Sequence, residues 1–218
     1  MRRAHIETRK VLTPQDRADA LRVIGAVFAQ EKNWISNTDA EIPEGIAESD
    51  RMSWFLTYAD GAPVGVIRLA YDPTLELPAH FEVQFDRPLD LVEFARGRRF
   101  VEIGRFMIVP EFRRNIRVVF SLMRIAVREV LERHYTHFLT DVYESDPHSP
   151  YGFHTRVLGF ERIGTHRFGE LNCDSLRIIL VLDIVRACRR VAQKRDRIYR
   201  ELVTGLEPLF EPIPASPL

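Results

Sequence analysis

The sequence predicts a mixed α/β (α+β) fold, with a mostly antiparallel sheet of seven strands flanked by helices. Asp60-Gly61 separates two apolar runs, which is a typical signal of a β-hairpin. A helical pattern of apolar residues covers 114–134. Seven strand-like runs are interspersed with helical segments, as in proteins that mix both elements in one layer structure. At 218 residues, the chain has the length of one domain with an appended element.

The elements follow in this order. A strand over 5–12 leads to Thr13-Pro14, an N-cap with proline at the first helical position, and a helix ending near Gln30. Strands follow over 52–58 and 62–70, and then a long loop over 72–98 with a short helix at 89–95. A strand over 100–109 precedes the long helix. The expected remainder is a strand over 137–143, a helix over 150–157, and strands over 161–168 and 175–184.

Composition narrows the function classes. Lys+Arg and Asp+Glu both total 31, so net charge favours no nucleic-acid partner. The two cysteines, Cys173 and Cys188, have no metal-ligand spacing, and we expect no metal site. The N-terminus lacks the apolar core of a signal peptide, and the longest apolar run covers only 178–182. We therefore expect a cytoplasmic enzyme.

The sequence after 184 predicts an added unit. Residues 1–184 form the expected domain, 185–206 an amphipathic helix with a basic face, and 207–218 a Pro-rich tail that frays. Such a helix can dock an acidic carrier protein or the surface of a membrane. It can equally pack against its own sheet or form a homodimer.

Charged residues interrupt the apolar strand 100–109. Strand alternation places Glu102 on one face, with Gly104 leaving room beside it, and Arg105 on the other. Glu102 is either a general base, with its pKa raised by burial, or a member of a structural ion pair. Beyond Pro110, Arg113, Arg114 and Arg117 surround a helix start at Asn115. This cluster is either a phosphate site or a solvated basic face.

These segments resemble a known superfamily. Pro110-Glu-Phe-Arg-Arg after the strand, with Val157-Leu-Gly-Phe-Glu-Arg-Ile-Gly164 later, is similar to the core of the GNAT (Gcn5-related N-acetyltransferase-like) acyltransferases. The resemblance implies that strands 100–109 and 137–143 splay apart and admit the pantetheine arm of a thioester donor, acyl-CoA or acyl carrier protein. It also implies that Glu102 deprotonates an amine, and that a main-chain N–H near Met107 or Ile108 polarises the thioester carbonyl. The residues expected at the donor are Ile108, Val109, Arg113, Arg114, Asn115, Arg117 and Val118.

The chain departs from the GNAT pattern at two places. Bulky Ile116 and Val118 occupy the small positions of the family's pyrophosphate turn. The tyrosine that often acts as general acid is replaced by Thr155 or Arg156, and His154 is the nearest substitute.

A narrower resemblance accounts for the first departure. Val27-Phe-Ala-Gln-Glu-Lys-Asn-Trp34 and Glu102-Ile-Gly-Arg-Phe106 resemble motifs of the acyl-homoserine-lactone synthases and N-acyl amino acid synthases. These branches commonly use acyl carrier protein, whose phosphopantetheine lacks a nucleotide diphosphate. The lactone synthases have an arginine where this chain has Gly25-Ala26, which favours the amino-acyl branch. The residues expected to bind substrate are Phe28, Trp34, Arg105 and Tyr143.

The sequence therefore predicts an N-acyltransferase that moves a medium- or long-chain acyl group to the amine of a small molecule or amino acid. One alternative is a short-chain, CoA-dependent N-acetyltransferase. The other is a catalytically silent protein that binds an acyl-pantetheine or a partner.

Overall fold

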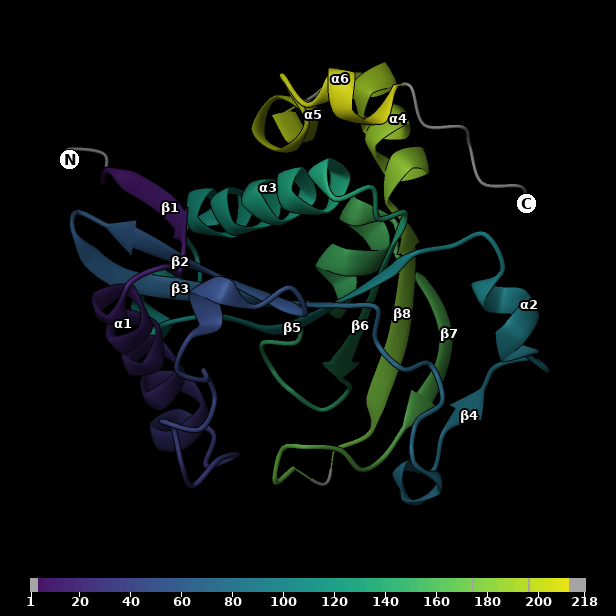
Figure 1. The fold of residues 1–218 in the computed structure, drawn as a ribbon, viewed down its shortest axis with the longest axis horizontal. Coiled ribbons are helices and arrows are strands. Elements are labelled where there is room, and N and C mark those ends of the chain that lie inside the picture. Colours follow the sequence, from purple (N-terminus) through teal and green to yellow (C-terminus); the bar gives the residue numbers. More distant parts are fainter. Residues whose placement is uncertain (1–3, 174, 196, 212–218) are drawn as a thin grey trace.

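The computed structural model describes residues 4–173, 175–195 and 197–211. One sheet contains eight strands in the order β1-β2-β3-β5-β6-β8-β7-β4. Neighbouring strands are antiparallel except β5 and β6, which are parallel. Figure 1 shows α3 over one face of the sheet and α1 over the other. The predicted mixed, mostly antiparallel α/β architecture is confirmed.

The elements match the expected order closely. The first half comprises β1 (Ile6–Lys10), α1 (Pro14–Ile24), η1 (Gly25–Glu31), η2 (Ile46–Glu48), β2 (Met52–Ala59), β3 (Ala62–Tyr71), η3 (Ala79–Phe81), β4 (Gln84–Phe85), α2 (Leu91–Ala95) and β5 (Phe100–Ile108). The second half comprises η4 (Pro110–Phe112), α3 (Ile116–Glu132), β6 (His137–Tyr143), η5 (Phe153–Leu158), β7 (Glu161–His166), β8 (Arg177–Asp183), α4 (Ile184–Lys194), α5 (Arg197–Leu202) and α6 (Glu207–Phe210). The eighth strand, β4, lies inside the expected loop and pairs with β7. Two residues are too short to show strand periodicity, so the sequence did not reveal it.

Two apolar cores hold the sheet between its helices. The larger core lies between α3 and the sheet, where Val101, Ile103 and Phe138 are buried against the apolar face of α3. The smaller core packs α1 and η1 against β2 and β3, around the buried Trp54. Thr13 starts α1 as predicted, because its hydroxyl accepts the Asp16 N–H in a capping box.

Strands β5 and β6 diverge halfway along their length. They pair from Phe100 opposite His137 to Ile103 opposite Thr140, and both strands then continue without pairing with each other. The Thr140 hydroxyl donates to the Ile103 carbonyl at 2.9 Å, which satisfies this acceptor where the ladder ends. The predicted splay between these strands is therefore present.

A β-bulge interrupts β5 next to the splay. The β3–β5 register shifts between Val66 and Arg68, and Arg105 has a left-handed φ of 50°. A bulge of this kind inserts one unpaired residue and changes which side chains face each side of the sheet. The strand alternation expected from the sequence therefore fails at Arg105.

The C-terminal segment packs on α3, above the sheet in Figure 1. The predicted C-terminal helix is present as α4, but it does not continue to 206, because Arg195 has a φ of 47° and ends α4. The prediction of a fraying tail from Glu207 is wrong for Glu207–Phe210, which forms α6 with Phe210 buried. Proline is compatible with the first turn of a helix, so Pro208 does not prevent α6. Residues 212–218 of the predicted tail lie outside the described residues.

Candidate active site

A pocket of about 680 Å³ passes through the splay between β5 and β6. On the α3 side it is bounded by Ile116, Val119 and Phe153, which pack against the larger core. On the other face it reaches the side chains of β3, β5, β6, β8 and β7. The size is typical of sites for small ligands. A pocket open through a gap in a sheet lets two reactants approach the same point from opposite faces.

An apolar wall lines the part of the pocket beside β4 and α2. It is formed by Pro73, Leu75, Leu77, Phe81, Val83, Phe85, Leu89, Leu91 and Phe94, all from the segment between β3 and β5. Leu139 and Ile179 line the same pocket from β6 and β8. This combination provides a continuous apolar surface for a hydrocarbon chain.

Glu102 lies on the pocket floor in an ion pair. Its Oε1 accepts a hydrogen bond from Arg68 Nη2 at 2.7 Å, and 39% of its side chain is exposed. The burial that the sequence suggested for Glu102 is therefore only partial. The carboxylate is both paired and accessible from the pocket, an arrangement that permits the ion-pair role and the base role together.

Arg105 belongs to the same charged network as Glu102. Its Nε donates to Glu41 at 2.6 Å, and its Nη2 donates to Glu170 at 3.1 Å. Glu170 also approaches Arg68 at 3.7 Å. The prediction that Glu102 and Arg105 lie on opposite faces is wrong, because the bulge turns Arg105 into the pocket.

The three aromatic residues expected to bind substrate form one cluster on the pocket wall. The rings of Phe28 and Trp34 lie 5.3 Å apart, and those of Trp34 and Tyr143 lie 4.2 Å apart. The Arg105 guanidinium lies 5.7 Å from the centre of the Phe28 ring. Burial beside Asp141 raises the pKa of Tyr143, so its phenol keeps its proton at neutral pH. The structure thus brings all four expected substrate residues together.

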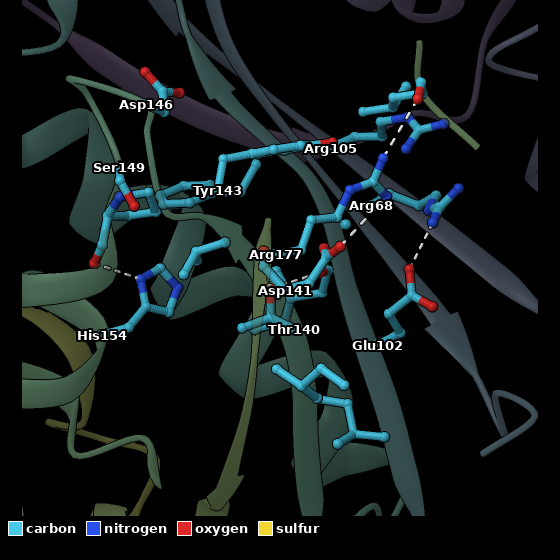
Figure 2. Close-up of a pocket in the computed structure, with 18 of the residues that line it drawn as sticks. Arg68, Glu102, Arg105, Thr140, Asp141, Tyr143, Asp146, Ser149, His154 and Arg177 are labelled. Carbon is cyan, nitrogen blue, oxygen red and sulfur yellow. Dashed lines mark hydrogen bonds and ion pairs between the residues drawn. The ribbon is translucent and has the colours of Figure 1, made fainter. Parts of the chain in front are cut away.

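Asp141, His166 and Arg177 form a second charged cluster that the sequence analysis missed. His166 Nε2 lies 3.0 Å from Asp141 Oδ2, and Arg177 Nη1 lies 3.6 Å from the same oxygen. Figure 2 shows Arg177 next to Asp141 in the middle of the pocket. Burial raises the pKa of Asp141, but the His166 hydrogen bond and nearby Arg177 outweigh it and hold this pKa below its usual value. The available signal was a charged residue within each of two predicted apolar strands: Asp141 in 137–143 and Arg177 in 175–184.

The strand after the bulge presents one main-chain N–H to the splay. Val109 N–H donates to Val64 O on β3 at 2.9 Å. Because successive residues of a strand point their N–H groups to opposite sides, Met107 also faces β3 and Ile108 faces the splay. Arg113 Nε donates to the Ile108 carbonyl at 3.1 Å, which confirms that direction. Of the two expected N–H groups, the geometry favours Ile108.

The expected phosphate turn is largely closed. Both terminal nitrogens of Arg113 donate to the Glu31 carboxylate, and this interaction lowers the pKa of Glu31. Asn115 caps α3: its Oδ1 accepts the Arg117 N–H at 3.2 Å, and its carbonyl accepts the Val118 N–H at 2.9 Å. Arg114 is exposed at the mouth of the pocket. Few free donors therefore remain here for a pyrophosphate.

Four expected donor-binding residues, Val109, Asn115, Arg117 and Val118, are not among the residues that line the pocket. The Val118 side chain is fully buried in the larger core, because bulky apolar residues at this turn pack inward. The Arg117 guanidinium donates to the Ala4 carbonyl at 2.9 Å. Val109 has its N–H bonded to β3. Their role at the donor stays a prediction.

His154 lies on the far side of the pocket from the charged residues (Figure 2). It is buried among Phe106, Phe153 and Phe160. Burial lowers its pKa, so the ring is neutral at pH 7, and its Nδ1 lies 3.0 Å from Pro150 O, which can only accept. The single ring proton is therefore on Nδ1 and is already used. A neutral ring whose only proton is bonded to a carbonyl does not fit the general-acid role that the sequence suggested.

Within the described residues, no group of three or more His, Cys, Asp or Glu side chains is arranged to hold a metal ion. No helix in these residues has the length and apolar character needed to cross a membrane.

Comparisons with known proteins agree with this geometry. The family model "N-acyl amino acid synthase FeeM" matches residues 19–177. The structure of FeeM, an N-acyl amino acid synthase from uncultured soil microbes, superposes with a TM-score of 0.64 at 18% identity, covering 88% of this chain and 99% of that one. An N-acetyltransferase from Staphylococcus aureus Mu50 gives a TM-score of 0.55 at 15% identity, with 84% and 99% covered. A GNAT-family acetyltransferase from Streptococcus pneumoniae gives 0.54 at 14% identity, with 82% and 99% covered. No curated protein matches the sequence.

Proposed function

This chain belongs to the family of the N-acyl amino acid synthase FeeM, in the GNAT superfamily of N-acyltransferases, and from this membership we propose its substrates. It transfers a medium- or long-chain fatty acyl group from the phosphopantetheine thioester of acyl carrier protein to the amine of an amino acid. The supporting observation is the pocket through the splay, because it joins an apolar wall, an accessible carboxylate and a free main-chain N–H.

The donor thioester lies in the splay between β5 and β6. The pantetheine arm enters from the side of α3 and extends between the two strands, much as an added strand would. The Ile108 N–H then donates to the thioester carbonyl oxygen, where negative charge develops in the transition state. The acyl chain continues along the apolar wall of 73–94.

The acceptor amine approaches from the face that carries Glu102. The Glu102 carboxylate takes a proton from the ammonium group, directly or through a water molecule. The neutral nitrogen attacks the carbonyl carbon, so that an N–C bond forms and the C–S bond breaks. The remaining excess proton on nitrogen neutralises the departing thiolate. Arg68 holds Glu102 in place during this transfer.

The donor is carried by acyl carrier protein in this proposal. A coenzyme A donor brings a pyrophosphate that needs free N–H groups and cations near α3, whereas the carrier-bound arm has a single phosphate. Arg113 is neutralised by Glu31, and Asn115 occupies two of the N–H groups. The exposed Arg114 attracts the acidic carrier by long-range charge.

Mass spectrometry of reaction products tests this function. The purified protein is incubated with matched acetyl, octanoyl, lauroyl and palmitoyl groups, each on acyl carrier protein and on coenzyme A, and with the standard amino acids. We expect long-chain N-acyl amino acids, formed faster from the carrier-bound donors. Formation of acetylated products alone, from coenzyme A, would instead identify a short-chain acetyltransferase. Absence of product with every donor would indicate a binding function.

A further inference from the structure

One corner of the pocket holds a buried arginine, Arg177, beside a histidine and an aspartate. Asp141 on β6, His166 on β7 and Arg177 on β8 point to the same face, because Tyr143 pairs with Arg177 and Arg177 pairs with His166. Both His166 and Arg177 are at least 95% buried, counting whole residues. Buried charges at this level are stable only when other charges or ligands balance them.

His166 lies closer than Arg177 to the Asp141 carboxylate. Its Nδ1 lies 2.9 Å from the Phe168 carbonyl oxygen, and its Nε2 lies 3.0 Å from Asp141 Oδ2. Arg177 Nη1 lies 3.6 Å from the same oxygen. Asp141 therefore makes its hydrogen bond with His166 and not with Arg177.

Among the described residues, Arg177 has no carboxylate oxygen within hydrogen-bond distance. Its closest carboxylate oxygen is the shared Asp141 Oδ2, at 3.6 Å. Its Nε is buried without a hydrogen-bond partner, and its Nη2 reaches only the Leu171 carbonyl, at 3.4 Å. The guanidinium also lies 5.0 Å from the centre of the Tyr143 ring. The described residues therefore leave this guanidinium with capacity to bind an anion.

The other arginines inside the pocket are paired with carboxylates. Arg68 is paired with Glu102, and Arg105 is paired with Glu41. Arg113 is paired with Glu31, and the exposed Arg114 lies at the mouth. Among the described residues, Arg177 is thus the buried pocket arginine that has no carboxylate within hydrogen-bond distance.

We propose that Arg177 binds the α-carboxylate of the acceptor amino acid, with Asp141 and His166 as positioning residues. This inference rests on the proposed acyl transfer to an amino acid. Glu102 pairs with Leu139, which lies two residues from Asp141 on the same face of β6. Arg177 lies two strands from Glu102, roughly 10 Å across the sheet, and four residues along β8 from Val181, the residue level with Glu102, which is roughly 13 Å. The two long side chains and the zwitterion between them span this separation when the amine lies at Glu102 and the carboxylate at Arg177.

Kinetics of paired acceptors test the proposal. Each amino acid that the enzyme uses is compared with its decarboxylated amine, in the wild-type protein and in Arg177→Gln. We expect KM for the amino acid to rise at least about 10-fold in Arg177→Gln, with kcat and the kinetics of the amine little changed. Arg177→Lys retains the charge and should recover part of the loss. Arg167→Gln, at an exposed arginine beside His166, is the matched control.

Direct binding separates this proposal from the proposed function. Isothermal titration calorimetry with the amino acid and the amine measures recognition of the carboxylate without any acyl donor. Equal binding of both by the wild-type protein, or an unchanged preference in folded Arg177→Gln, would overturn the role of Arg177 even where acyl transfer occurs. Tight binding of the amino acid without transfer from any donor would support Arg177 and refute the proposed reaction.

Discussion

Glu102 combines two properties that are usually exclusive at the scale of one residue. Its Oε1 is held by Arg68, while its exposure leaves the second carboxylate oxygen open to the pocket. A base needs an oxygen that can reach the proton, so the ion pair orients Glu102 without blocking this role. The structure therefore removes the conflict between the two hypotheses that the sequence raised.

Glu102→Gln tests the base directly. We expect turnover to fall roughly 10²-fold, the usual loss for a general base, because the amide cannot accept the proton. The fold should persist, since Arg68 keeps Glu170 nearby and glutamine fills the same space. Steady-state kinetics and thermal unfolding measure the two effects. Glu82→Gln, an exposed glutamate paired with Arg167, is the control. Near-normal turnover in a folded Glu102→Gln protein would leave Glu102 with a structural role only.

The residues that sequence reasoning found and missed differ in their surroundings. Glu102, Phe28 and Trp34 belong to segments with a recognisable pattern, and the structure places all of them on the pocket. Arg177 and His166 belong to no such pattern, and their meaning depends on cross-strand pairing. Register cannot be derived from one sequence when several pairings bury similar apolar faces.

At the scale of elements, the start of α3 determines how the donor is held. Asn115 caps the helix, so the N–H groups of Arg117 and Val118 already have hydrogen-bond acceptors within the protein. Arg114 remains exposed beside the pocket mouth, whereas the Arg117 guanidinium is bonded to Ala4. A substitution at Arg114 therefore tests attraction of a carrier protein without removing a contact within the fold, unlike one at Arg117.

Arg114→Glu should raise KM for the carrier-bound donor and change kcat little, because it acts on encounter and not on chemistry. The effect should weaken as salt rises, since exposed charges are screened beyond about 8 Å at physiological ionic strength. Steady-state kinetics at several salt concentrations measure this, with exposed Arg51→Glu as the charge-matched control. An equal rise for both Arg114→Glu and Arg51→Glu would indicate a general charge effect.

Helices and strands were predictable where their patterns were long. The hairpin at Asp60-Gly61, the N-cap at Thr13 and the amphipathic α3 all lie where expected. Strand β4 and the break at Arg195 were not predictable, because each depends on what the rest of the chain offers for pairing or packing. The same limit applies to the bulge in β5.

At the scale of the whole molecule, burial of histidines couples stability to pH. Burial lowers the pKa of His137 to about 4 and also lowers that of His154. The unfolded chain binds these protons more readily than the folded one, so stability is complete above the unfolded pKa, about 6.5, and falls as pH decreases. The loss for His137 continues down to about pH 4.

His137→Gln should flatten this part of the pH dependence. Between about pH 7.5 and about pH 5, the wild-type protein should lose about 2 kcal/mol more unfolding free energy than the variant. Urea unfolding at each pH measures the difference, and exposed His5→Gln serves as the control. Parallel curves for wild-type and His137→Gln proteins would show that His137 does not contribute to the acid sensitivity.

The bulge at Arg105 also affects how this chain should be compared with relatives. Before it, even-numbered residues of β5 such as Glu102 face the pocket and odd-numbered Ile103 faces α3; after it, odd-numbered Met107 packs toward α1 and even-numbered Ile108 toward α3. The parity of the strand is thus reversed within one element. An alignment that runs through β5 without a gap, against a protein that lacks this extra residue, assigns every later position to the wrong face. Deleting one residue here would turn the side chains after the bulge to the opposite face, so that residues now in the larger core would face the smaller one and the reverse. The composition of β5 would hardly change.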